Sequence, residues 1–462
     1  MSSAVAPAPQ ATRMPAALVV PVALGTLLQA LNSSMIAVAL GQIRTEFHAG
    51  ASASWLISGL YLATAVGAPT MGRLADLIGP RRVFLSGIAL VGIAAVAAMF
   101  APDIGWLIAM RVLLGIGTSA PYPAGLAMIR AEADRRGITD AAGGLGVLAI
   151  AAQVAVALGP PLGGVLVQFA GWRAIFAVNV PFVLIALVMA VRYLPADGER
   201  GATPRGGVLQ RLDGTGLVLF TSAMGAVMMF LLSLSEQPLW PLAPVAIALV
   251  LLLVLRELRA AHPFLDVRLL VTNRPLTATY LRCGLTYVAF YAIFYGLPAW
   301  LEQARGLRAA EAGLVLLPIA GLGAITVVLA TRLERRTGPR GLLLFGSGVL
   351  LLGGLALTCV GVSTPVVALV LLAAALGVPN GFNSLGNQTA LYRAAPADQM
   401  GGASGLYRTS QYVGANLAAA VIELCFAGPV SDAGLHRMGL VVAAISAVLL
   451  VTALSSRHLR RR

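Results

Sequence analysis

Long apolar stretches, each close to 20 residues and almost free of charge, recur along the whole chain. A helix of that length crosses the roughly 30 Å hydrocarbon core of a bilayer, because it rises about 1.5 Å per residue. Lipid offers no partner to backbone N–H and C=O groups, so such stretches must form helices in a membrane. The sequence therefore predicts an all-α integral membrane protein.

We count fourteen such stretches and predict fourteen transmembrane helices. The first eight lie at 17–40, 53–72, 83–101, 105–127, 141–168, 173–192, 214–234 and 240–256. The last six lie at 276–300, 309–331, 341–360, 364–391, 402–427 and 437–456.

A short polar loop shows how these helices are grouped. Its sequence at 72–82 is GRLADLIGPRR, and a related sequence, TRLERRTGPR, occupies 331–340. The first loop joins the second and third stretches, and the second loop joins the tenth and eleventh. The related halves are thus eight stretches apart, which places two extra helices between two six-helix bundles. Parallel repeats of this kind occur in secondary transporters.

This grouping predicts five segments. They are a disordered cytoplasmic tail at 1–16, an N-terminal six-helix bundle at 17–194, a linker with two inserted transmembrane helices at 195–260, a C-terminal six-helix bundle at 261–456 and a cytoplasmic tail at 457–462.

The net charge of +14 reflects the membrane topology, because the basic residues gather on one side of the predicted helices. All 32 basic residues are arginines, and with the N-terminus inside, 24 of them fall on the inner loops and tails. Five fall on outer loops, namely Arg44, Arg173, Arg305, Arg308 and Arg437. Such a bias places both termini in the cytoplasm of a bacterial inner-membrane protein. A nucleic-acid-binding patch would gather on one soluble domain instead.

Several classes of site are excluded. The three cysteines lie inside apolar stretches, and no histidine has metal-ligand spacing on one helix. We therefore predict no enzyme, no metal and no cofactor. The longest loops, near 193–212 and 257–275, are too short for a sensor or catalytic domain, which makes a receptor or polytopic enzyme a weak alternative.

Three motifs identify a family resemblance. They are the loop at 72–82, Arg111 within RVLLGIG, and GPPLGG at 159–164; Trp172 with Asn179 and LDxxG at 212–216 add to them. In this order they resemble the fourteen-helix drug/proton antiporter-2 family of the major facilitator superfamily, over nearly the whole chain. The resemblance implies a major facilitator fold.

The resemblance also implies roles for the motifs. The loop residues Gly72, Asp76, Gly79, Arg81 and Arg82 would form a conformational latch between the bundles, although a topology anchor is an alternative. Arg111 would take part in proton coupling, or else extend to the membrane surface. The residues Gly159, Pro160, Gly163 and Gly164 would form the antiporter motif, which goes with export; helix packing alone explains them as well.

Polar side chains at helical spacing predict a substrate cavity. Because polar groups in lipid are unfavourable, such faces should point to a water-filled cavity or to each other. The candidates are Gln29, Asn32, Arg282, Tyr287, Tyr291, Asn380, Asn383, Asn387, Arg408, Tyr412 and Asn416. Interhelical hydrogen bonds are the alternative for the amides. A tyrosine face with scattered amides suits an amphipathic aromatic molecule.

Asn32 departs from the family pattern, which has an aspartate here. An amide cannot carry a proton or attract a cation by charge, so neutral or anionic substrates become more plausible. Glu423 is the acid that lies clearly within an apolar stretch. It is therefore our candidate for proton coupling together with Arg111, and it would have to be shielded from water to exchange protons near neutral pH.

The sequence thus predicts a secondary transporter that exports small amphipathic compounds or drugs across the inner membrane. It would work by alternating access as a proton-coupled antiporter, and as a monomer. Its partners would be the substrate, protons and the lipid bilayer, with no nucleic acid. The alternative is a related transporter dedicated to one physiological metabolite, by export or import.

Overall fold

The computed structural model describes residues 14–49, 53, 55–138, 142–197, 213–233, 239–260, 263–426 and 430–459. Across these ranges the regular structure is helical and no strand occurs, which confirms the predicted all-α class. Most of the predicted tail at 1–16, the first part of the linker at 198–212 and the last residues of the tail at 460–462 lie outside the described residues.

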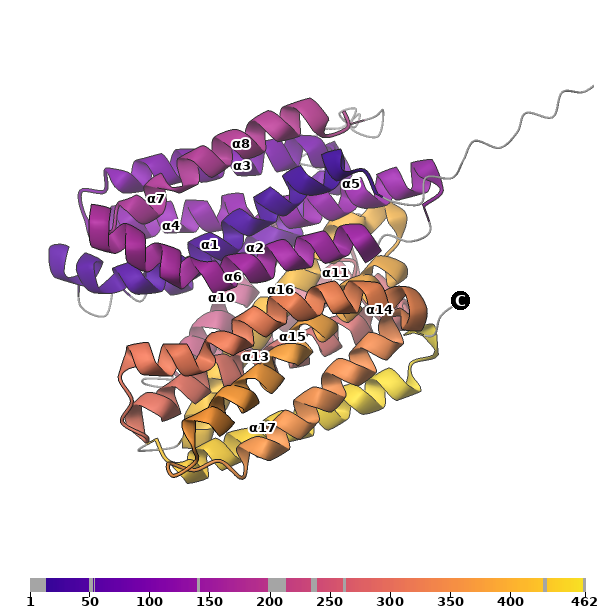
Figure 1. Cartoon of the computed structure of the whole chain (residues 1–462). Coiled ribbons are helices and arrows are strands. Elements are labelled where there is room, and N and C mark those ends of the chain that lie inside the picture. The colour runs from indigo at the N-terminus through magenta and orange to yellow at the C-terminus, as the bar shows by residue number, and fades with distance from the viewer. Residues whose placement is uncertain are drawn as a thin grey trace, which may run out of the picture.

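The helices form two bundles that lie side by side (Figure 1). The first bundle contains α1 (Ala16–Glu46), α2 (Trp55–Ile78), α3 (Pro80–Met99), α4 (Ile104–Ser119), α5 (Pro121–Arg136), α6 (Ala142–Ala170), α7 (Ala174–Ala177) and α8 (Asn179–Tyr193). The second contains α13 (Arg274–Gln303), α14 (Ala309–Leu357), α15 (Val366–Ala394), α16 (Met400–Phe426) and α17 (Asp432–Ser455).

Two further long helices lie between the bundles in sequence, α10 (Gly214–Ser233) and α11 (Leu242–Glu257), followed by the short α12 (Val267–Thr272). α11 packs on α10, and α10 contacts α2 of the first bundle and α16 of the second. The inserted pair therefore covers the boundary at which α2 and α16 meet.

Each predicted stretch coincides with a helix or with two consecutive helices. Within the described ranges, nine helices are long and apolar enough to cross a membrane, and the bent α6 would make ten. This number is below fourteen partly because α14 contains two predicted spans and α11 has only 16 residues. α2 and α16 are long enough to cross a membrane but are not among the nine.

The repeated loop turns at a glycine with positive φ in both halves. Gly79 and Gly338 have φ values of +106° and +66°, and each is followed by a proline that begins the next helix. Glycine adopts positive φ without strain, and proline is favoured in the first turn of a helix. The Gly–Pro pair thus reverses the chain between α2 and α3, and again within α14.

The GPPLGG segment bends α6 against α1. The axes of Gly143–Val156 and Pro161–Ala170 differ by 46°, as the loss of backbone hydrogen bonds at consecutive prolines leads one to expect. A Cβ atom at Gly159 would lie 1.7 Å from the Ser34 hydroxyl oxygen. The glycine therefore permits the close approach of α1 and α6, which is the packing role considered above.

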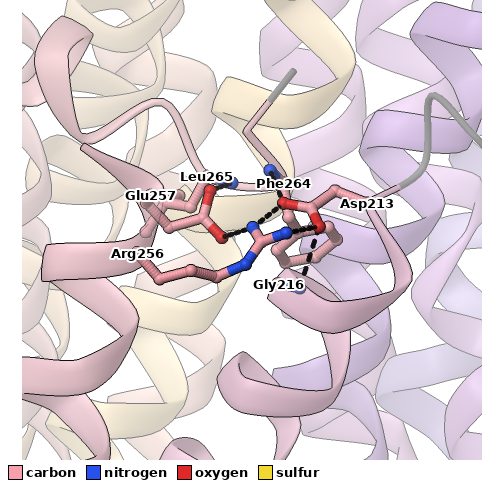
Figure 2. Close-up of polar contacts among 6 residues, drawn as sticks. All are labelled: Asp213, Gly216, Arg256, Glu257, Phe264 and Leu265. Atoms are coloured by element: carbon pink, nitrogen blue, oxygen red, sulfur yellow. Dashed lines mark hydrogen bonds and ion pairs between the residues drawn. The ribbon is translucent and has the colours of Figure 1, made fainter. Parts of the chain in front are cut away.

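An ion-pair cluster ties the inserted pair to the chain that enters the second bundle (Figure 2). Asp213 pairs with Arg256 and accepts hydrogen bonds from the amides of Gly216 (3.0 Å) and Phe264 (3.2 Å). Glu257 accepts from Arg256 at 3.1 Å and from the Leu265 amide at 3.2 Å. Asp213 thus caps the first turn of α10 and also joins it to α11.

Burial and hydrogen bonds have opposite effects on the pKa values of the two carboxyl groups in this cluster. Burial disfavours the ionised form of Asp213, but hydrogen bonds from Arg256 and Gly216 outweigh it and lower the pKa of this carboxyl. Burial raises the pKa of Glu257, because its hydrogen bond from Leu265 and its pairing with Arg256 compensate less fully. Asp213 is therefore the principal anion of the cluster.

Candidate functional site

The two bundles meet where α2 crosses the start of α16. Asp76 accepts hydrogen bonds from the backbone amides of Gly401 (2.9 Å) and Gly402 (2.8 Å). A Cβ atom at Gly72 would lie 2.1 Å from the Gly401 carbonyl oxygen, so the two backbones touch. Gly72 and Asp76 thus connect the bundles at the end where α17 finishes, which we call the terminal end.

The other residues of the loop act within the first bundle. The amides of Arg81 and Arg82 donate to the Asp197 carboxylate at 2.9 and 3.1 Å. The Arg81 guanidinium also donates to the Val191 carbonyl at 2.6 Å. Because Val191 lies on α8 and Asp197 follows it, these contacts fasten the start of α3 to the end of α8. The loop at 72–82 therefore makes one connection between the bundles and a second one within the first bundle.

Arg111 lies deep inside the first bundle. Its side chain, on α4, donates from Nε to the Leu56 carbonyl (2.9 Å) and from one terminal nitrogen to the Asn32 carbonyl (3.1 Å). The other terminal nitrogen is buried without a partner. With the residue only 1% exposed, the guanidinium does not extend to the surface but joins α4 to α1 and α2.

Asn32 also lies within the first bundle. Its amide exchanges two hydrogen bonds with Asn179 of α8, at 2.6 and 3.2 Å. Asn32 was predicted to line the substrate cavity, whereas its side chain lies toward α8. Asn32 therefore forms interhelical hydrogen bonds, which were the alternative prediction for the amides.

Gln29 and Tyr412 meet across the boundary between the bundles. The Gln29 amide, on α1, donates to the Tyr412 hydroxyl on α16. Tyr61 of α2 contacts the Tyr412 ring with a centroid distance of 5.7 Å, and Thr409 donates to the Ala65 carbonyl at 2.7 Å. These candidates therefore belong to a buried interface formed by α1, α2 and α16.

The tyrosines of α13 form a ladder along the helix. The ring centroids of Tyr287 and Tyr291 are 5.9 Å apart, and those of Tyr291 and Tyr295 are 5.3 Å apart. Phe290 and Phe294 pack beside them. This spacing of four residues places an aromatic face on α13, as the sequence indicated.

The asparagines of α15 lie in the second bundle. A small pocket is lined by Thr286, Phe290, Ile293, Ile319, Leu350, Leu376, Pro379, Asn380 and Asn383. Both polar atoms of the Asn383 amide are buried without a partner, and Asn387 donates to the Thr286 hydroxyl at 3.4 Å. The pocket thus lies among α13, α14 and α15.

Arg282 and Arg408 lie on α13 and α16. Arg282 is 3% exposed and donates to the Thr279 hydroxyl of its own helix at 2.8 Å. The guanidinium carbon of Arg408 lies 4.1 Å from the centre of the Tyr122 ring, which belongs to α5 of the first bundle. Both residues are therefore part of the buried region between the bundles.

The position of Glu423 differs from the shielded position that was predicted for it. Glu423 is exposed and lies near the end of α16, one turn before Phe426. Asn416, two turns earlier, donates to the Tyr412 carbonyl of its own helix at 2.8 Å. Because the helix turns Glu423 outward, it lacks the burial that we required of a proton carrier, and that expectation is corrected.

The other buried carboxylates lie at the terminal end of the molecule. Glu132 pairs with Arg135 and Arg136. Glu334 pairs with Arg393. In the described part of the chain no carboxylate forms an ion pair with the arginines of the central region, which are Arg111, Arg282 and Arg408. The same residues contain no group of three or more potential metal ligands.

Sequence reasoning missed three tyrosines of this interface. Tyr61, Tyr122 and Tyr407 lie outside the polar stripes from which the cavity was predicted. Tyr122 and Tyr407 are nevertheless buried, and their rings stack with centroids 6.4 Å apart. A buried tyrosine in a lipid-spanning stretch is itself a signal, because its hydroxyl needs a partner.

Comparison with known proteins agrees with this architecture. The chain is 36% identical over 422 residues to the uncharacterized MFS-type transporter YwoD of Bacillus subtilis, covering 91% of this chain and 92% of that protein. It is 28% identical to the tetracenomycin C resistance and export protein of Streptomyces glaucescens, covering 89% and 76%. The solved structure of the proton:xylose symporter XylE, 14% identical, superposes with a TM-score of 0.64 over 93% of this chain and 94% of that one.

These comparisons confirm the major facilitator fold and a transporter rather than an enzyme. The family model described as Major Facilitator Superfamily matches residues 22–419, which include the inserted pair and most of both bundles and end before α17. The chain is a multi-pass membrane protein, and it belongs to the Major Facilitator Superfamily.

Proposed function

We propose that this protein exports small amphipathic compounds, drugs among them, by alternating access of a central site. The observation that carries the proposal is the buried interface of tyrosines, amides and arginines between α1, α2 and α5 on one side and α13 and α16 on the other. Such groups are unfavourable in lipid and are found where they line a transport path. A relative of the chain is named as a resistance and export protein.

The membrane would be the bacterial inner membrane, with the terminal end in the cytoplasm. The arginine-rich loops at 72–82 and 331–340 support this orientation, because positive loops remain inside. Asp76 would then close the cytoplasmic end of the transport path when it binds Gly401 and Gly402. We propose that release of this contact opens the site to the cytoplasm, and that a monomer suffices for the cycle.

The driving force that we propose is the proton gradient, by antiport. Arg111 is a candidate for this step because it is buried, with one nitrogen unpartnered, between α1 and α2. The exposed position of Glu423 gives no support to that residue as the carrier. Coupling to protons therefore has to be measured directly.

The test uses purified protein in liposomes and a strain that lacks its own drug pumps. A growth and accumulation screen against a drug panel identifies a transported compound. Its efflux is then recorded in liposomes under a pH gradient, under a membrane potential, and under neither. Gradient-dependent efflux supports the proposal, and proton movement recorded alongside identifies antiport. Uptake into the cell in the same strain would favour the importer, and the absence of any transported compound would count against export of drugs.

A further inference from the structure

Four buried hydrogen-bond donors without a partner lie close together at the boundary between the bundles. They are Nε of Arg282, Nε of Arg408 and the hydroxyl groups of Tyr122 and Tyr407. Tyr122 and Tyr407 are 2% and 0% exposed, and Arg282 is 3% exposed. Buried polar atoms are almost always hydrogen-bonded, so four unpaired donors in one place require an explanation.

Contacts among these residues show that they form one cluster, which we call the arginine–tyrosine cluster. The Arg408 guanidinium lies 4.1 Å from the centre of the Tyr122 ring, and that ring stacks on Tyr407. Arg282 precedes Cys283 on α13, and the Cys283 thiol contacts the Tyr407 carbonyl at 4.0 Å. The cluster thus combines α5 with α13 and α16.

The charge of the cluster is positive and unbalanced. The partners that the structure gives the two guanidiniums are neutral: Thr279 for Arg282, and Gln411, which accepts from Arg408 at 3.1 Å. In the described ranges no carboxylate pairs with either arginine, since the buried acids lie at the terminal end with arginines of their own. A buried charge without a counter-charge is strongly unfavourable.

We propose that the arginine–tyrosine cluster binds the anionic group of an amphipathic aromatic substrate, such as a carboxylate. This inference rests on the proposed function and names its substrate class. The anion would accept from both Nε atoms and both hydroxyl groups, and it would supply the missing negative charge. Guanidinium groups match the geometry of a carboxylate, and hydrogen bonds between charged groups are the stronger ones.

The neighbouring residues suit the remainder of such a substrate. Tyr412 lies one helical turn after Arg408 on α16, and Tyr287 begins the aromatic ladder of α13. An aromatic body could therefore stack on this ladder while its acid group binds the arginines.

The cluster also fits an alternating-access cycle. Tyr122 belongs to the first bundle, whereas Arg282 and Arg408 belong to the second, so the stacked tyrosines close the site in this conformation. Separation of α5 from α16 would open it. A membrane potential that is negative inside favours outward movement of an anion, so export of this substrate class does not depend on a carboxyl in the site.

The test compares three probes of nearly equal shape: naphthalene-2-carboxylate, 2-naphthamide and naphthalene-2-carboxamidine. Binding to the protein in lipid nanodiscs is measured by calorimetry. We expect the anion to bind about tenfold more tightly than the neutral amide, because a charge-assisted hydrogen bond adds roughly that factor. The cation should bind most weakly.

Variants then assign the preference to the cluster. Arg282→Gln and Arg408→Gln should reduce the ratio of anion to amide affinity toward one, whereas Arg437→Gln, an exposed arginine on α17, should leave it unchanged. Tyr122→Phe removes one donor with little change in shape, and it tests the site if an arginine variant does not fold. Size-exclusion chromatography verifies folding.

The outcomes separate this inference from the proposed function. Equal affinity for the three probes, preference for the cation, or no binding of any probe overturns the anion site. Transport of neutral or cationic drugs with no anion preference would leave export standing and reject the anion site. Selective anion binding without transport in liposomes would leave the site standing and reject export.

Discussion

Asn32 of α1 and Asn179 of α8 exchange two hydrogen bonds in the interior of the first bundle, where Asn32 is 3% and Asn179 1% exposed. The Asn32 carbonyl also accepts from Arg111 at 3.1 Å. The position that carries an acid in the resembling family is thus occupied here by a neutral amide whose donors and acceptors are used within the protein. The arginine beside it has no carboxylate partner.

The first prediction concerns the change of Asn32→Asp. The introduced carboxylate would face Asn179, on a residue whose backbone carbonyl accepts from Arg111, and one buried nitrogen of Arg111 has no partner. We expect the variant to acquire a buried titratable group, so that its transport depends on pH in a way that transport by the unmodified protein does not. Transport of an identified substrate in liposomes at a series of pH values measures this effect.

Asn32→Ser is the matched control for that variant, because it removes the amide without adding an ionisable group. Its transport should be weaker than that of the unmodified protein but should have the same pH profile. If Asn32→Asp and Asn32→Ser gave the same profile, Arg111 and position 32 would not form a proton-coupling unit.

The second prediction concerns the contact between Asp76 and the start of α16. Asp76→Asn replaces one acceptor oxygen by a donor, so one of the two bonds to Gly401 and Gly402 is lost. A hydrogen bond to a charged group contributes roughly 1.5–3 kcal/mol, so closure of the terminal end should be destabilised about tenfold or more. We expect slower transport with substrate binding retained, measured as exchange rate and affinity on the same preparation.

Glycine substitutions test the same contact by shape. Gly72→Ala would place a Cβ atom 2.1 Å from the Gly401 carbonyl and should impair transport in the same way, whereas Gly41→Ala meets nothing within 4 Å. Loss of membrane insertion in Asp76→Asn and Gly72→Ala, with no effect on exchange in the inserted fraction, would instead favour a topology anchor.

Much of the fold could be predicted from the sequence, because a chain in lipid has to satisfy its backbone hydrogen bonds within its own helices. The length of each apolar stretch dictates a helix, and the repeated Gly–Pro at Gly79 and Gly338 marks equivalent turns in both halves. The bend within α6 follows from its consecutive prolines. The break between α4 and α5 at Pro121 was less evident, because a hydropathy pattern does not report it.

The site could be predicted only in part. Helical spacing found the Tyr287–Tyr291 face, and it placed Gln29 and Tyr412 among the candidates without showing that they contact each other. It could not tell which way a side chain turns, so Asn32 and Glu423 were misplaced. Orientation about the helix axis is set by neighbouring helices, and these are distant in sequence.

The third prediction corrects the role of Glu423. Because this residue is exposed near the end of α16, we expect Glu423→Gln to retain gradient-driven transport within about twofold, as is usual for surface substitutions. Efflux under an imposed pH gradient measures this. Loss of coupling with intact folding would restore Glu423 as the proton carrier, and Glu302→Gln at the end of α13 serves as a second exposed control.

The fourth prediction concerns the cluster that joins the inserted pair to the second bundle. Asp213 pairs with Arg256, and its side chain is 6% exposed. Asp213→Asn leaves Arg256 with a weaker partner, and removal of one member of a buried pair destabilises by about 3–5 kcal/mol. Glu257 still pairs with Arg256 in this variant, so we expect a destabilisation in the lower part of that range. Thermal unfolding in detergent measures it.

The pH dependence of this effect has a definite sign. The pKa of Asp213 is lowered in the folded protein, mainly because hydrogen bonds from Arg256 and Gly216 outweigh the effect of burial. Its contribution to stability is therefore present above its unfolded pKa of about 3.9 and is lost as the pH falls through the folded value. The unmodified protein and Asp213→Asn should thus differ most at neutral pH and converge in acid. Asp134→Asn, which breaks the exposed pair with Arg130, should change the melting temperature little at any pH, and an equally large change there would show that burial of the Asp213 cluster is not the cause.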